Sequence, residues 1–141
     1  MKKKITQFKW LVTMLLLVTA MAMPKMAWAK ITTTPPSSGD GTSANPYQIG
    51  TAEELYWFAA LVNGTLGGET KNASENAVLT ADITVNTGVL KSDGTHADDV
   101  SGFETWIPIG NNLNPYTGTF DGQGHTISGL YFNALVSTKN D

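Results

Sequence analysis

Near its carboxyl end the chain reads Tyr116-Thr-Gly-Thr-Phe-Asp-Gly-Gln-Gly-His-Thr-Ile-Ser-Gly-Leu-Tyr-Phe132. Short β-prone pieces alternate with glycines, so the backbone turns every few residues and makes no long flat strand. This pattern is typical of one coil of a parallel β-helix, a fold in which neighbouring coils must stack to bury their apolar face. Four side chains are expected to fill the interior of the coil: Phe120, Ile127, Leu130 and Phe132.

Upstream of this coil the sequence predicts one helix. Thr51 and Glu54 form a capping box at its start, and Gly64 ends it because glycine adopts the left-handed conformation without steric penalty. The apolar positions repeat at i, i+3, i+4 and i+7, which gives one buried stripe. That stripe consists of Leu55, Phe58, Ala59 and Val62.

The remaining β-structure is expected in three short segments: Tyr47–Gly50, Val78–Val85 and an edge strand at Trp106–Gly110. Pro108 restricts the last segment to an edge, since proline donates no ladder hydrogen bond. The fold class is therefore mainly β with one helix. The dipeptide Asp121-Gly122 leaves an alternative open, a small α+β domain that ends in a β-hairpin.

The first 29 residues, 1–29, have the three parts of a secretory signal peptide. Met1-Lys-Lys-Lys4 supplies a basic start, and Trp10–Met23 is an uncharged, mostly apolar run. Ala27-Trp-Ala29 provides the small-x-small pattern that places cleavage before Lys30. The run is shorter than the roughly 20 residues that span a bilayer. We therefore expect a secreted or cell-surface protein without membrane insertion after cleavage, and keep an uncleaved anchor as the alternative.

Composition narrows the classes of partner. Five of the nine lysines lie in the predicted signal, so the mature part carries four lysines against twelve acids, a formal charge of −8, and the chain contains no arginine. A nucleic-acid ligand is not expected, because binding phosphates requires a basic face. The chain also contains no cysteine. Disulfides and lipid attachment through a cysteine are therefore excluded.

The first part of the mature chain, residues 30–46, is rich in turn-forming residues and is expected to be a linker to a domain at 47–141. A cation held by Asp40 and Thr42 is an alternative interpretation of this linker. Its composition of polar, turn-forming residues favours the linker.

A second acidic stretch, residues 93–99, contains three aspartates and His96. A solvated loop is the preferred interpretation, because the ordered acid spacing of a calcium loop is missing. A zinc site is also disfavoured, because the other histidine, His125, lies 29 residues away and the chain has no thiol. We assign no catalytic, cofactor-binding or metal-binding residue.

Five blocks follow one another along the chain: Gly39-Asp-Gly-Thr with Asn45-Pro-Tyr-Gln-Ile49, Thr51-Ala-Glu-Glu-Leu55, Leu79-Thr-Ala-Asp-Ile83, Trp106-Ile-Pro-Ile-Gly110 and Tyr116 to Leu130. In this order they resemble the amino-terminal part of GLUG-motif bacterial surface proteins, over residues 39–133. The resemblance implies a cap and first coil of a right-handed parallel β-helix on a secreted, adhesin-like protein. The repeat array of that family should follow Phe132 and does not, so a truncated β-helix is expected.

The function expected from this resemblance is a non-enzymatic, structural cap for a repeat array. Alternatives are a fragment of a β-helix carbohydrate-active enzyme or of a secreted peptidase. Asp121 is the only acid in the coil-like stretch, whereas glycosidases need converging carboxylates. The chain also has no His-Glu-x-x-His pattern. The expected partners are an unidentified protein or glycan at the surface, and a second copy bound through the open carboxyl-terminal edge.

Overall fold

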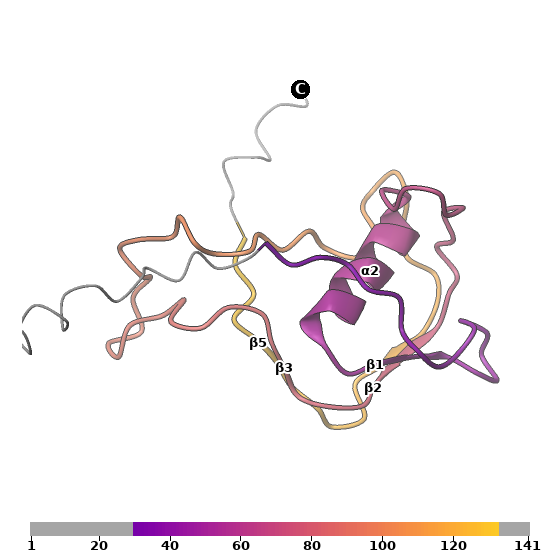
Figure 1. Cartoon of the computed structure of the whole chain (residues 1–141), viewed down its shortest axis with the longest axis horizontal. Coiled ribbons are helices and arrows are strands. Elements are labelled where there is room, and N and C mark those ends of the chain that lie inside the picture. Colours follow the sequence, from indigo (N-terminus) through magenta and orange to yellow (C-terminus); the bar gives the residue numbers. More distant parts are fainter. Residues whose placement is uncertain (1–29, 133–141) are drawn as a thin grey trace, which may run out of the picture.

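The computed structural model of the chain describes residues 30–132 (Figure 1). The predicted signal peptide and the last nine residues lie outside this range. One helix and five short strands follow in chain order: β1 (Tyr47–Ile49), α2 (Ala52–Asn63), β2 (Ala77–Leu79), β3 (Ile83–Thr84), β4 (Phe120–Asp121) and β5 (Ile127–Ser128). The structure confirms the coarser part of the expected fold class, a small chain with short strands and one helix.

The strands form two open sheets in which every strand pairing is parallel. One sheet has the order β1-β2-β4, and the other contains β3 and β5. Ala77 of β2 pairs with Phe120 of β4, and Ile83 of β3 pairs with Ile127 of β5. Residues 77–84, which we call the first layer, therefore lie against residues 120–128, the second layer, and the two run side by side in Figure 1.

This topology does not contain the hairpin of the alternative fold. β4 and β5 belong to different sheets and pair with β2 and β3 rather than with each other. Between them Gln123 and Gly124 adopt left-handed φ values of 49° and 79°, and the His125 amide donates to the carbonyl of Gly122 at 2.7 Å. The Asp121-Gly122 segment thus begins a corner that carries the chain from one sheet to the other.

Two of the predicted strands are corrected by the structure. The segment 78–85 is divided into β2 and β3 by a corner, and Asp82 in this corner accepts a hydrogen bond at 2.8 Å from the Thr126 amide of the second layer. Residues 106–110 do not form a strand. Only Thr105 makes a parallel bridge, to Tyr131, and the chain then turns toward the helix, where the Pro108 carbonyl accepts a hydrogen bond from Asn63 at 3.0 Å.

Helix α2 begins and ends where the sequence predicts. Thr51 is its N-cap and shares a complete capping box with Glu54, while Gly64 adopts a left-handed φ of 72° at the C-cap. The four residues of the predicted stripe are all buried, and Phe58 is fully enclosed. The helix, the first sheet and β3 share one hydrophobic core, which contains Ile49, Leu55, Trp57, Phe58, Leu61, Val62, Ala77, Leu79 and Ile83.

The two ends of the sheets differ in how they are covered. Residues 30–46, expected to be a linker, contain no helix or strand but lie along β1 and α2 through hydrogen bonds, including those from Gln48 N to Ser38 O at 3.0 Å and from Thr34 N to Glu53 O at 3.3 Å. At the other end, the expectation that Leu130 and Phe132 fill the interior is wrong. Their exposed fractions are 41% and 56%, because no layer covers the second layer within residues 30–132.

Candidate functional site

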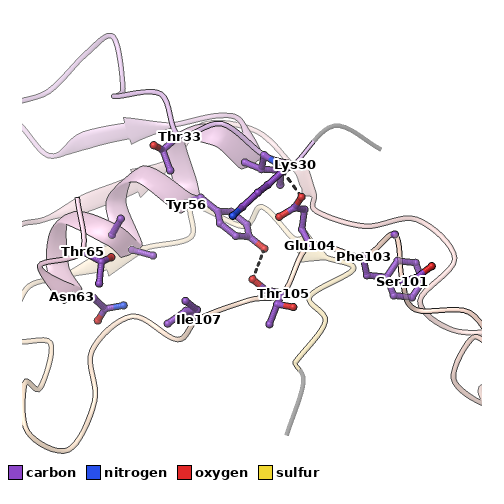
Figure 2. A pocket seen from close by; sticks show the side chains of 14 residues that line it. Lys30, Thr33, Tyr56, Asn63, Thr65, Ser101, Phe103, Glu104, Thr105 and Ile107 are labelled. Carbon is purple, nitrogen blue, oxygen red and sulfur yellow. Dashed lines mark hydrogen bonds between the residues drawn. The ribbon is translucent and has the colours of Figure 1, made fainter. Parts of the chain in front are cut away.

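A groove lies beside helix α2, on the side where the amino-terminal residues meet the loop 101–107 (Figure 2). Its volume is about 680 Å³. The walls come from residues 30–33, from the face of α2 that carries Tyr56, and from the loop. Three titratable side chains line it: Lys30, Tyr56 and Glu104.

Tyr56 joins the helix to the loop. Its hydroxyl donates a hydrogen bond to the Thr105 carbonyl at 3.2 Å, and its ring meets the ring of Trp106 edge-on, with centroids 5.3 Å apart. Burial raises the pKa of Tyr56 to about 12, and the nearby Glu104 carboxylate adds to the shift. At neutral pH the phenol is therefore a neutral donor with a structural contact, and it does not act as a base.

Glu104 is the acidic residue that lines the groove. Its backbone is clamped by Asn86, whose side-chain oxygen accepts from the Glu104 amide at 2.7 Å and whose side-chain nitrogen donates to the Glu104 carbonyl at 2.9 Å. The Glu104 carboxylate accepts a hydrogen bond from the Ile31 amide at 3.0 Å. The loop is thus tied to the amino-terminal segment by one side chain whose backbone is held in place.

Asn86 was not singled out by the sequence. It directly follows an alternating stretch in which Leu79, Ala81, Ile83 and Val85 were expected to point inward, so its position in the alternation predicts an outward, solvated side chain. In the structure only 9% of it is exposed, and it also donates to the Gly129 carbonyl at 2.8 Å. No local sequence pattern predicts that Asn86 is buried and hydrogen-bonded, because its three hydrogen bonds reach residues 18 and 43 positions away.

The acidic stretch 93–99 consists of local turns. Asp93 accepts hydrogen bonds from the amide and hydroxyl of Thr95, which lower its pKa. Asp98 pairs with Lys91 at 2.6 Å, and Asp99 accepts from Ser101. In the part of the chain that the structure describes, no group of three or more His, Cys, Asp or Glu side chains is placed to hold a metal ion.

The carboxylates outside residues 93–99 that the sequence singled out also accept hydrogen bonds from nearby residues. Asp40 accepts from the amide and hydroxyl of Thr42, which lower the pKa of its carboxyl. Asp121 accepts from the Gln123 amide at 3.0 Å. His125 lies 3.4 Å from the Asp82 carboxylate, and the Thr126 amide is the main cause of the lowered pKa of Asp82, with His125 second. These carboxylates stabilise turns and corners, and the structure does not bring them together.

The outer edge of the second layer is the other candidate surface. β4 and β5 are the last strands of their sheets, so one side of each is unpaired within the described range. Leu130 and Phe132 are exposed next to this edge. Free backbone donors and acceptors beside apolar side chains favour the addition of another strand.

Among residues 30–132, α2 is the one helix, and it is not long and apolar enough to cross a membrane. Comparison of the chain with family models, with curated proteins and with solved structures gives no match. The function is therefore inferred from the geometry described above.

Proposed function

We propose that this protein is an exported, non-enzymatic, adhesin-like surface module, and that its folded part caps a right-handed parallel β-helix. The observation that carries the proposal is the difference between the two ends of the stacked layers. All their pairings are parallel, β1 at one end is covered by residues of the same chain, and β4 and β5 at the other end are unpaired on their outer side within the described range. Solenoid arrays require a terminal unit of this kind, because an internal repeat leaves both faces exposed when it stands alone.

The covered end begins the array. Tyr47 N of β1 donates to Asn76 O on the side of the first layer, while Gln48 N donates outward to Ser38 O. The outer edge of β1 is therefore occupied by residues of the same chain. The segment that covers it continues to Gly41, which is buried and whose carbonyl accepts from the Asn76 amide at 2.7 Å. Such coverage blocks the pairing of a further strand at this end.

The open end continues the array. A following layer of the same polypeptide would pair with β4 and β5 and would cover Leu130 and Phe132, as the second layer covers the first. The parallel register needs no change for this addition, since each layer presents the same strand direction to the next. Uncovered, the same edge is expected to recruit a second copy of the chain.

The edge can be tested on purified residues 30–141 by light scattering over a range of concentrations. We expect self-association that decreases when Leu130 and Phe132 are both replaced by lysine, because charge on an edge opposes strand addition. Leu113→Lys is the matched control, since Leu113 is 90% exposed in a loop away from the strands. A cooperatively unfolding monomer at every concentration would show that the edge needs no cover and would overturn the proposed cap.

Export is tested separately. The basic start, the apolar run and the Ala27-Trp-Ala29 site predict that the extracellular product begins at Lys30. Amino-terminal sequencing of protein recovered outside the cytoplasm is the measurement. A product that begins at Met1 would contradict the predicted signal peptide, without bearing on the fold of residues 30–132.

A further inference from the structure

We propose that removal of the signal peptide creates a structural contact: the new α-ammonium group of Lys30 pairs with the Glu104 carboxylate and fastens the loop 101–107 across helix α2. The inference rests on the export proposed above. It assigns a second role to the cleavage, beyond release of the protein, because the unprocessed chain has an uncharged amide at this nitrogen.

The geometry places the new charge one residue from an existing acceptor. The amide of Ile31 already donates to Glu104 Oε1 at 3.0 Å, and Lys30 lines the same groove as Glu104 and Tyr56 (Figure 2). Consecutive residues lie about 3.8 Å apart along the chain. The Lys30 nitrogen is therefore within one residue of a carboxylate that has a second oxygen available in its acceptor inventory.

The chemistry of cleavage supplies the charge. Hydrolysis of the Ala29–Lys30 peptide bond adds hydroxide to the Ala29 carbonyl carbon and a hydrogen to the Lys30 nitrogen. The resulting α-amine takes up a further proton near neutral pH, since the usual pKa of this group is about 7.7–8.0. The charged group is a stronger donor to a carboxylate than the amide it replaces.

The carboxylate is held ready for this contact. Both backbone hydrogen-bonding groups of Glu104 are bonded to Asn86, and the next residue, Thr105, is held by the Tyr56 hydroxyl. Glu104 is also the only acidic side chain that lines the groove. An amino terminus bound here is connected through Thr105 to Tyr131 at the open end of the second layer, where the two residues form a bridge.

The test uses four purified proteins: the chain that begins at Lys30, the chain that begins with Gly-Ser before Lys30, and each of these with Glu104→Gln. We expect the urea midpoint of the Lys30 form to exceed that of the extended form, and we expect Glu104→Gln to remove this difference. In the Lys30 form the α-amino pKa, followed by NMR after reductive methylation, should lie about half a unit above its usual value. Glu69→Gln, in an exposed loop, is the matched control and should leave both readings unchanged.

A difference between the two forms that persists in Glu104→Gln, or an α-amino pKa that is not raised, would overturn the contact. All four proteins are made with a removable tag, so the result does not depend on the cell's own processing. Failure of the predicted signal peptide would appear in the amino-terminal sequencing described above, and the two inferences are therefore refuted by different measurements.

Discussion

Replacement of Asn86 by alanine is expected to be among the most destabilising polar substitutions in this protein. Asn86 is the single buried polar residue within the described range, with 9% of its surface exposed. Its amide group makes three hydrogen bonds, at 2.7, 2.8 and 2.9 Å, to the backbone of Glu104 and Gly129. It thereby joins the first layer to the loop 101–107 and to the turn that follows β5.

The magnitude follows from these contacts. An intramolecular hydrogen bond contributes about 0.5–1.5 kcal/mol net, so three bonds correspond to about 1.5–4.5 kcal/mol. Alanine leaves the Glu104 amide, the Glu104 carbonyl and the Gly129 carbonyl without their partner, which favours the upper half of that range. We expect a loss of about 3 kcal/mol in the free energy of unfolding. A domain of this size has a total of about 5–15 kcal/mol.

The assay is equilibrium unfolding of residues 30–141 in urea, followed by tryptophan fluorescence. Asn111→Ala is the matched control, because Asn111 is exposed and its side chain only closes a local turn to Leu113 and Asn114. Its cost should stay below about 1 kcal/mol. Equal midpoints for Asn86→Ala and Asn111→Ala would refute the role of Asn86 as the connection between layer, loop and turn.

Further predictions concern the helix and two titrating groups. Thr51→Ala should lower the free energy of unfolding by about 1 kcal/mol through loss of the N-cap, and Phe58→Ala by about 3–5 kcal/mol because its ring is fully buried; an unchanged urea midpoint in either variant would count against the assignment. The folded pKa of Tyr56, raised to about 12 from 10, means that stability present below pH 10 is lost as the pH rises through 12. Tyr56→Phe should abolish this alkaline loss. In the unsubstituted protein, titration followed by tyrosine absorbance should show a phenol that ionises at about pH 12. The lowered pKa of Asp82 implies stability that is present above pH 3.8 and lost on further acidification. Asp82→Asn should therefore weaken the dependence of the urea midpoint on acid pH. The same acid dependence in the variant and the unsubstituted protein would argue against the corner contact.

The helix was predictable to the residue because its signals are local. The capping box of Thr51 and Glu54 and the glycine at position 64 are chemistry within one or two turns of backbone, and each is formed as the sequence indicates. The apolar stripe was equally local in origin. Its burial required only that one apolar face find a partner, and the adjoining sheet supplies it.

The corners were less predictable because contacts distant in sequence determine them. Alternation from Leu79 to Val85 is continuous, so the sequence gives no reason to break a strand there. The break depends on Asp82, which accepts from Thr126 of the second layer. The buried position of Asn86 escaped prediction for the same reason, and so did the groove, whose walls come from three separate parts of the chain.

The comparison of the two layers explains how the corners and the strands can vary independently. Ala77 pairs with Phe120 and Ile83 with Ile127, so the corner of the second layer is one residue longer than that of the first. The extra residue is absorbed where Gln123 and Gly124 take left-handed φ values, and both strand pairings remain parallel and in register. Stacking therefore constrains the strands and leaves the corner lengths free. If the folded part is the proposed cap, a further layer added to β4 and β5 would need to match only these two strands, and the loops of the array could then differ from coil to coil.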